Sequence, residues 1–474
     1  MDSESWQNAG FRVQRARDLL RRARLPEALE ELRAAVELEP DDADHHFELG
    51  RCFELLGRDA EAADRYERAA ELAPDRPDAW ASLGGVWLAM ERWRDAVAAF
   101  DRVERLRPDF EPCYSGRVWA LAELGQHERC EEMFYLAQQL RDDRPWPFYH
   151  VGRSLAARGQ TAKALWCLRQ CEDLCAAHPL PAGRRGEYIC RHHEPAWLAT
   201  EAIVRAAEIH AAAGDHEAAR RQFLRALSRD GCHVEALLGL AELLLSMRRF
   251  AEAGARIRRA VRLEPDEPHG HYVAGRRYLA LGKLNEAHVA LRRTVELSPG
   301  YPRAHLYLAR IAARQEDAAE VRRQGHLEMT RRPDEPETLS ELGSLLMDVG
   351  DLEHAVACFK RLVAIEPGDS RAWQNLGVAE CWRGEHMAGV VASRRAVKLD
   401  PSNLAAANNL GLAFLDLGEL DAAAKVIADG LALDPKHPPL RRLRLRLRLR
   451  RLGLRARAVG RRLLPLHRGE RGDG

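Results

Sequence analysis

The sequence predicts an all-α protein, a solenoid of about twelve repeated helical hairpins. The first observation is a period, because Pro333, Pro367, Pro401 and Pro435 follow one another every 34 residues. The second is the pattern inside each period, where two short segments carry apolar and small residues at the spacings typical of amphipathic helices. One hairpin cannot bury its own apolar faces, so a fixed period of this kind indicates stacked neighbours that share a core.

The second unit shows how each hairpin is expected to form. Its two helices each carry an apolar stripe, with Leu49, Gly50 and Phe53 in the first and Ala62, Tyr66 and Ala69 in the second. Gly57 lies between the stripes, where the end of a helix needs a residue that tolerates positive φ. Pro74 ends the second helix, because proline has no N–H and clashes with a continuing turn.

The third unit carries the pattern most fully, in Trp80, Leu83, Gly84, Trp87, Ala96, Phe100 and Pro108. At these positions it resembles the tetratricopeptide repeat, and the resemblance extends over twelve units, roughly residues 9–437. The family implies a right-handed superhelix of helix pairs. It also implies a concave groove, lined mainly by the first helix of each unit, that binds peptides or partner proteins. It does not imply a particular partner.

The period divides the chain into four predicted segments. These are an N-terminal array of repeats 1–5 (1–178), a non-repeat insertion (179–199), a C-terminal array of repeats 6–12 (200–437) and an Arg/Leu-rich basic tail (438–474). The insertion is expected to be a loop on one face, either at the binding face or as a tolerated surface loop. In the tail, Arg and Leu alternate from Arg441 to Arg451. We expect a partly helical stretch over the last unit there, followed by disorder from about Pro465.

The composition favours a soluble protein, with 46% apolar and 31% charged residues. The sequence has no run of ~18 apolar residues, and its charged N-terminus lacks a signal core. We therefore expect no membrane span, no secretion and a cytoplasmic location. Several of the 10 cysteines, including Cys130 and Cys171, occupy small-residue positions of the repeat, which fits a reducing compartment better than a disulfide framework.

The formal net charge of +1 hides an asymmetry. Residues 438–474 contain 13 Arg against Glu470 and Asp473, a net charge of +11, so the other 60 basic and 70 acidic side chains give residues 1–437 a net charge of −10. The tail is therefore expected to fold back on the acidic array, to contact nucleic acid or to contact an anionic membrane.

Candidate binding residues occupy first-helix positions that packing does not use. Units four and five have an aromatic group of Trp119, Trp146, Tyr149, His150 and Arg153, and units six and seven have an acidic strip of Glu201, Glu208, Glu235 and Glu242. Units eight and nine have a basic strip of Tyr272, Arg276, Arg303, Tyr307, Arg310 and Arg314, and units eleven and twelve align Asn375 with Asn409.

Each group suits a particular contact. Aromatic side chains beside an Arg are typical of interface hot spots, although Trp119 and Trp146 also fit packing under the insertion. The basic strip suits carboxylates, and the asparagines suit the backbone of an extended peptide. The acidic strip equally fits a solvated surface.

No catalytic motif is found, whether a phosphate loop, GxGxxG or HExxH, so we expect no enzyme activity and no cofactor. Cys167, Cys171 and Cys175 share a helix face, followed by His178 and, in the insertion, by Cys190 and His192. A tetrahedral metal site and ordinary close packing of cysteine both fit this group, and packing is favoured.

The sequence as a whole predicts a non-catalytic protein-interaction scaffold that binds peptides or partner helices in the groove. Two alternatives remain open. The sequence also fits a subunit that recruits substrate for an enzyme on another chain, and a nucleic-acid or membrane adaptor that works through its tail.

Overall fold

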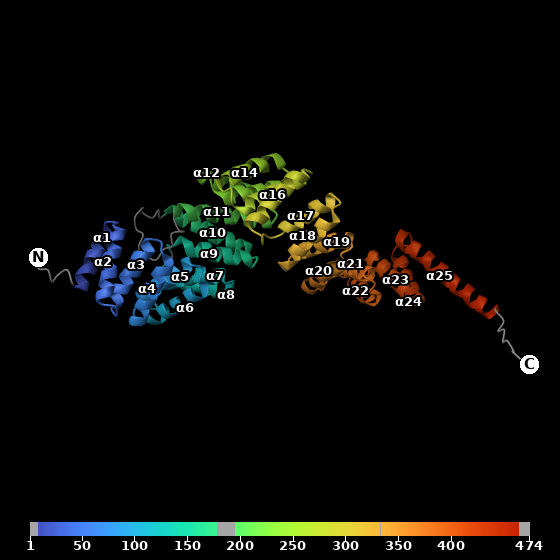
Figure 1. The fold of residues 1–474 in the computed structure, drawn as a ribbon, viewed down its shortest axis with the longest axis horizontal. Coiled ribbons are helices and arrows are strands. Elements are labelled where there is room, and N and C mark those ends of the chain that lie inside the picture. Colours follow the sequence, from blue (N-terminus) through green and yellow to red (C-terminus); the bar gives the residue numbers. More distant parts are fainter. Residues whose placement is uncertain (1–7, 142, 178–194, 332, 464–474) are drawn as a thin grey trace, which may run out of the picture. The chain divides into compact units, whose positions relative to one another are not determined.

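The computed structural model describes residues 8–141, 143–177, 195–331 and 333–463, which contain 25 helices and no strand (Figure 1). The first 24 helices pair into twelve hairpins, from α1–α2 to α23–α24, and α25 follows them. The predicted all-α class and the solenoid of helical hairpins are confirmed.

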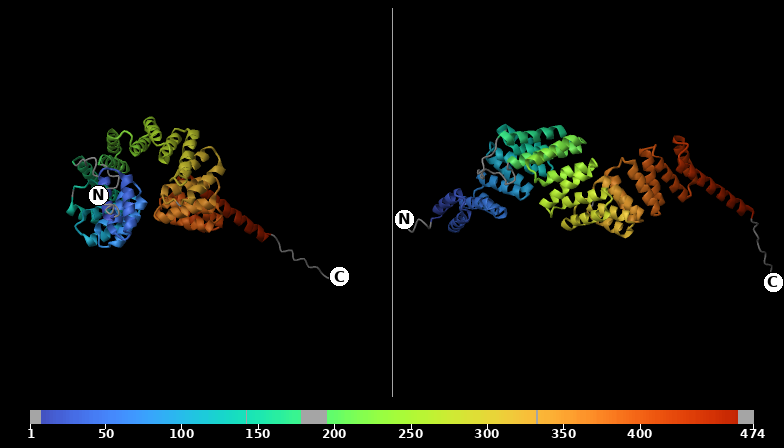
Figure 2. Two further views of the ribbon diagram at one scale, coloured as in Figure 1. Left: turned by 60° about the vertical axis from the view of Figure 1, so that its left-hand side comes forward. Right: turned by 90° about the horizontal axis from the view of Figure 1, so that it is seen from above.

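The helices fall into two compact units. The first unit, residues 1–263, holds α1 (Ala9–Arg21), α2 (Leu25–Leu38), α3 (Ala43–Leu55), α4 (Asp59–Leu72), α5 (Pro77–Ala89), α6 (Trp93–Leu106), α7 (Glu111–Glu123), α8 (His127–Leu140), α9 (Pro145–Ala157), α10 (Thr161–Ala177), α11 (Pro195–Ala212), α12 (His216–Arg229), α13 (Val234–Ser246) and α14 (Phe250–Leu263). The second unit, residues 264–474, holds α15 (Pro268–Ala280), α16 (Leu284–Leu297), α17 (Ala304–Arg314), α18 (Ala318–Thr330), α19 (Pro336–Asp348), α20 (Leu352–Ile365), α21 (Ser370–Trp382), α22 (His386–Leu399), α23 (Leu404–Leu417), α24 (Leu420–Leu433) and α25 (Pro438–Leu463). Within each unit, consecutive hairpins lie side by side (Figure 2).

One residue with a left-handed backbone joins the two helices of every hairpin. It is a glycine in eight hairpins, for example Gly57 with φ of 73°, and it is Ala23, Glu91, Arg248 or Glu316 in the other four. A Cβ atom disfavours this conformation, and backbone hydrogen bonds across the turn hold it in those four hairpins, for example from the N–H of Arg24 to the carbonyl oxygen of Leu19 at 2.9 Å. The turn residues therefore keep the register that the prolines predicted.

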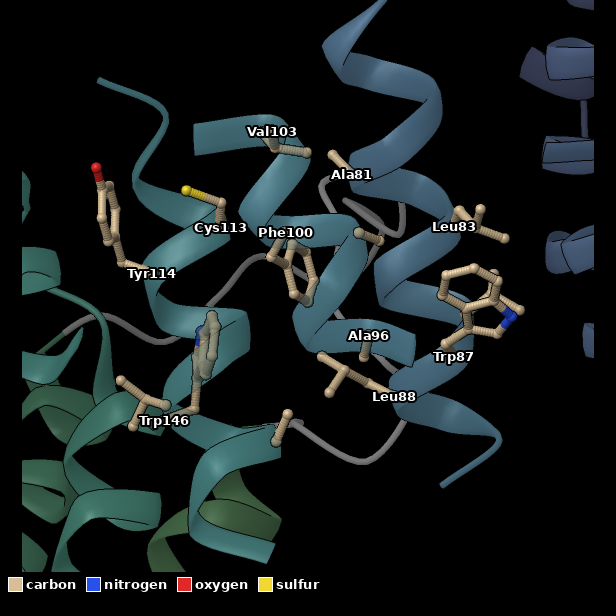
Figure 3. Close-up of a cluster of buried hydrophobic side chains, with 14 of the residues drawn as sticks. Ala81, Leu83, Trp87, Leu88, Ala96, Phe100, Val103, Cys113, Tyr114 and Trp146 are labelled. Atoms are coloured by element: carbon tan, nitrogen blue, oxygen red, sulfur yellow. The ribbon is translucent and has the colours of Figure 1, made fainter. Parts of the chain in front are cut away.

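The close approach of helices depends on a small residue in the first helix of a hairpin. A Cβ added at Gly84 would lie 2.8 Å from the ring of Phe100, and one added at Gly116 would lie 2.5 Å from the same ring. Phe100 of α6 thus fits between α5 and α7 (Figure 3). Gly50 meets Tyr66 and Gly343 meets Phe359 in the same way, each pair 16 residues apart like Gly84 and Phe100.

The stack continues across the break in the sequence period. α11 begins at Pro195, so residues 195–199, which the sequence analysis placed in the insertion, are helical. Leu198 and Ala199 are buried in the same apolar cluster as Trp146 and Leu168. This burial favours a longer first helix in the sixth hairpin, and α11 has 18 residues. The rest of the predicted insertion up to residue 194 lies outside the described residues.

α25 covers the end of the last hairpin. Leu440, Leu443 and Leu447 are buried in one cluster with apolar residues of α23 and α24. Arg451 pairs with Asp421 at 2.6 Å, and Arg450 donates to the carbonyl oxygen of Leu415. The first part of the basic tail is therefore a helix that packs on the array. The disorder expected from about Pro465 falls on residues outside those described.

Two neighbouring glycines of α5 test the packing constraint. Gly84→Ala should lower the free energy of unfolding by ~1–3 kcal/mol, because its Cβ overlaps Phe100. Gly85→Ala should raise it by ~0.5–1 kcal/mol, because a Cβ there meets nothing within 4 Å and alanine is the better helix former. Urea unfolding followed by circular dichroism measures both. Equal effects of the two substitutions would show that the register is wrong.

Candidate functional site

The aromatic group of the first unit lies on α7 and α9. Half-buried Trp119 stacks on His150, with ring centroids 5.0 Å apart and planes inclined by 17°. The ring centroid of Trp93, at the start of α6, lies 5.8 Å from that of Trp119. Arg153 pairs with Glu123 at 2.6 Å and keeps 39% of its side chain exposed.

The expectation that all of these residues are exposed is wrong for three of them. Trp146, Tyr149 and His150 are only 9%, 5% and 3% exposed. Trp146 packs in the same cluster as α11, which fits the alternative of packing, while His150 is covered by Trp119 and Tyr149 by its contact with Glu201. Trp119 and Arg153 are the members of the group that still present an accessible surface.

Most carboxylates of the predicted acidic strip are paired with basic side chains. Glu201 is 4% exposed, and its carboxylate lies 3.0 Å from Nε2 of His233 and accepts the hydroxyl of Tyr149 at 3.4 Å. A residue that the sequence analysis did not consider, Arg205, binds three of the four glutamates: Glu201 at 3.3 Å, Glu208 at 2.9 Å and Glu235 at 2.7 Å. Arg205 lies four residues after Glu201 and three before Glu208, and this spacing on one helix could have predicted the ion pairs.

The pKa shifts in this network follow from burial and charge. Burial, together with the charge of Glu201, raises the pKa of Tyr149 to about 12. Burial opposes ionisation of Glu201, but hydrogen bonds and charges of His233 and Arg205 outweigh it and lower the pKa of this carboxyl. The hydrogen bond to Glu201 raises the pKa of His233. In the neutral ring Nδ1 of His233 accepts the backbone N–H of Ala236, and in both protonation states Nε2 is the nitrogen that donates to Glu201.

The basic strip of the second unit rests on two buried tyrosines. Tyr272 and Tyr307 pack edge to face with centroids 5.6 Å apart, and each is less than a tenth exposed. The expectation that these two rings are exposed is therefore also wrong, since they pack on each other and Tyr272 also packs on Tyr301. Burial, with a smaller contribution from Tyr307, raises the pKa of Tyr272.

Three arginines lie over these rings. The guanidinium carbon of Arg276 is 5.5 Å from the centre of Tyr272, and those of Arg303 and Arg310 are 6.0 and 5.1 Å from the centre of Tyr307. All three arginines are partly exposed. We call the set Tyr272, Arg276, Arg303, Tyr307 and Arg310 the arginine–tyrosine face.

Acidic residues of α19 border the arginine–tyrosine face. Arg310 pairs with Glu341 at 2.9 Å, and Arg303 lies 4.0 Å from Glu337. Exposed pairs of this kind contribute only about 0–1 kcal/mol, so a carboxylate from another molecule can replace Glu341 at small cost. Arg314, at the end of α17, is exposed and donates weakly to the carbonyl of Leu279 at 3.4 Å.

The remaining predicted residues are less distinctive. Asn375 and Asn409 are partly buried on α21 and α23, two helices that contact each other. Cys167, Cys171 and Cys175 are buried in α10, and burial raises the pKa of the Cys171 thiol, which disfavours the thiolate that a metal needs. His178, Cys190 and His192 lie outside the described residues.

Two other groups could hold a cation among the residues that the structure describes. Their ligand atoms lie within 4.8 Å of one another in His326, Asp351 and His354 and in Glu39, Asp42 and His45. Neither group was predicted from the sequence. For the first, no spacing in the sequence brings His326 of α18 to Asp351 beside α20.

Comparison with known families decides the identity of the repeat. Sequence models described as tetratricopeptide repeat match residues 13–77, 60–109, 200–276, 272–320, 336–369 and 383–438, which together exceed half of the chain. The chain belongs to the tetratricopeptide repeat family. A sequence search of curated proteins returned no match. Among the described residues of this tetratricopeptide repeat protein, no helix is both long and apolar enough to cross a membrane.

Comparison with solved structures returned matches of low identity that cover most of the chain. Yeast Tom70 is 14% identical, with a TM-score of 0.40 and coverage of 94% of this chain and 96% of that chain. The Cut9–Hcn1 hetero-tetramer of the APC/C gives 12% identity, a TM-score of 0.36 and coverage of 91% and 95%. Naa15/Naa10 bound to HypK-THB is 13% identical, with a TM-score of 0.36 and coverage of 93% of this chain and 91% of that chain. The family assignment rests on the sequence models.

The pair of His233 and Glu201 should make stability depend on pH. Because the pKa of His233 is raised in the folded protein, this residue stabilises the fold below its unfolded-state pKa, near 6.5. That stabilisation is lost as the pH rises through its folded-state pKa. The lowered pKa of Glu201 means that its contribution is present above about pH 4.5 and is lost in more acidic solution. His233→Gln should therefore destabilise by ~1–3 kcal/mol near pH 5.5 and by less at pH 9.

Urea unfolding at the two pH values measures this difference. The exposed His216, in the same unit, provides the control, and His216→Gln should change stability equally little at both. A loss for His233→Gln that is the same at pH 5.5 and pH 9 would contradict the role of the pair.

Proposed function

We propose that this chain is a non-catalytic protein-interaction scaffold, and that the arginine–tyrosine face binds an acidic segment of a partner protein or peptide. Stacked repeats present extended surfaces on which such segments dock. The observation that supports this face most strongly is the placement of Arg276, Arg303 and Arg310 over buried tyrosine rings. The rings restrict the arginines before binding, which lowers the entropy lost when a carboxylate docks.

The chemistry of the face favours a carboxylate-bearing partner. Guanidinium groups bind carboxylates through two parallel hydrogen bonds, and the face already binds one carboxylate, that of Glu341. Trp119 and Arg153 in the first unit provide a second, smaller accessible contact. A role as the substrate-recruiting subunit of an enzyme complex is a special case of the same proposal, and co-purification with an active enzyme would distinguish it.

Removing two of the arginines should strongly reduce the capture of partners. In affinity capture from a cell lysate, quantified by mass spectrometry, Arg276→Ser/Arg310→Ser should recover specific partners at least tenfold less well than the wild type. Glu341→Ala should instead increase binding by up to about fivefold, because it releases Arg310 from a competing carboxylate.

A matched variant separates this face from overall charge. Arg292→Ser/Arg395→Ser removes the same charge from exposed positions on the second helices α16 and α22, and it should capture partners as the wild type does. Equal losses in both double variants, or a loss in neither, would refute binding at the arginine–tyrosine face.

A second candidate function is favoured by the geometry of α25. Alternation of Arg and Leu, wound on a helix of 3.6 residues per turn, separates the leucines into two opposite rows. One row, Leu440, Leu443 and Leu447, is buried on the array, while the other, Leu445, Leu449 and Leu452, is 58–60% exposed. Rows of arginine lie between them, with Arg442, Arg446 and Arg450 on one side and Arg441, Arg444 and Arg448 on the other.

This arrangement suits an anionic membrane surface. The exposed leucines would enter the boundary of the acyl chains, and the flanking arginines would reach the phosphate groups. Association of two copies through α25 is disfavoured, because rows of arginine would face each other. An acidic amphipathic helix of another protein is the competing occupant.

Sedimentation with vesicles tests this second function. The wild type should bind vesicles of phosphatidylcholine with phosphatidylglycerol but not vesicles of phosphatidylcholine alone, and Leu445→Ser/Leu449→Ser should reduce binding at least fivefold. Leu433→Ser is the control, because Leu433 is equally exposed, at 60%, but lies on α24. Point variants are preferred to removal of the tail, since truncation would uncover the buried leucine row. Unchanged binding in the double variant would contradict membrane docking.

A further inference from the structure

Three side chains with metal-ligating atoms meet beside the tenth hairpin. Asp351 precedes α20 and caps it, accepting the backbone N–H of His354 at 3.4 Å. His354 lies in the first turn of α20, and His326 comes from α18 of the preceding hairpin. We call His326, Asp351 and His354 the imidazole–carboxylate cluster.

The three groups converge closely. Nε2 of His326 lies 2.7 Å from Oδ2 of Asp351, and Nδ1 of His354 lies 2.8 Å from Oδ1. The centroids of the two imidazole rings are 3.9 Å apart. The carboxylate is only 11% exposed, whereas the imidazoles are 44% and 39% exposed, so the cluster opens to solvent through its rings.

The donor atoms of the cluster are already grouped as a cation site requires. Both carboxylate oxygens of Asp351 face imidazole nitrogens, at 2.7 Å for His326 and 2.8 Å for His354. The cluster thus joins one anionic oxygen ligand to two nitrogen ligands.

We propose that the imidazole–carboxylate cluster binds a divalent transition-metal ion of the zinc type. Two imidazoles and one carboxylate are a typical donor set for zinc, while calcium and magnesium prefer oxygen ligands alone. An ion 2.0–2.2 Å from each ligand needs ligand atoms within roughly 4.3 Å of one another. The ligand atoms here lie within 4.8 Å, so small rotations of exposed side chains suffice.

The ion would join two neighbouring hairpins. His326 belongs to the ninth hairpin, which has Glu316 in a left-handed turn and Gly325 inside α18, both unfavourable to a stable hairpin. A bond from α18 through the ion to Asp351 and His354 would hold this hairpin against the tenth. The open positions of the ion face solvent, where water or a side chain of a partner completes its coordination.

Zinc titration of the full chain tests the proposal. The protein is prepared without a histidine tag, treated with a chelator and titrated against a chromophoric zinc indicator, beside His326→Gln, His354→Gln and His271→Gln variants. His271 is the control, because it lies in the same unit and its ring binds the carbonyl of Pro265. The wild type and His271→Gln should bind one more equivalent of zinc than the other two variants, whose affinity at this site should fall at least tenfold.

A second measurement does not depend on the indicator. Zinc should raise the melting temperature of the wild type and of His271→Gln, but not that of His326→Gln or His354→Gln, and circular dichroism checks that all variants fold. Zinc bound equally well by all four proteins would place the ion elsewhere, for example at the cysteines of α10. That result, or no zinc bound by the wild type, would overturn the proposal.

Discussion

The structure depends on a close contact between a small residue in the first helix of a hairpin and the side chain 16 positions later in the second helix. Phe100 shows the constraint most clearly, since glycines on both neighbouring first helices leave room for its ring. Where the second helix has a smaller residue, the backbones come closer still, and a Cβ at Gly377 would lie 2.4 Å from Oγ of Ser393. Where it recurs, this contact sets how closely the two helices of a hairpin pack, and Gly116 extends it from Phe100 to the next hairpin.

This packing decides which side chains are left for binding. On α15 and α17 it buries Tyr272 and Tyr307 and leaves Arg276, Arg303 and Arg310 partly exposed above them. In the first unit, by contrast, Glu201 of α11 and His233, the N-cap residue of α13, are both buried and pair with each other. The position of a residue in the repeat therefore indicates on which face of its helix it lies. The neighbouring residues determine whether its side chain is exposed to solvent.

Much of the fold could be predicted from local rules. The prolines gave the period, and the turn residues followed at their expected places even where Glu316 replaces glycine. The candidate site was harder, because exposure depends on the adjacent hairpins. Tyr149 and His150 were expected at the surface, but α11 and Trp119 cover them.

The contact of His326 with Asp351 joins two hairpins through side-chain geometry that no repeat position specifies. The start of α11 was missed for a related reason, since the repeat pattern ends before Pro195 while the burial of Leu198 continues the helix. We propose that binding takes place on the first helices of the second unit. Hydrogen exchange of the full chain, with and without a captured partner, is the measurement that decides this. Added protection on α15, α17 and α19 is the predicted result, and protection confined to the second helices α16, α18 and α20 would contradict it.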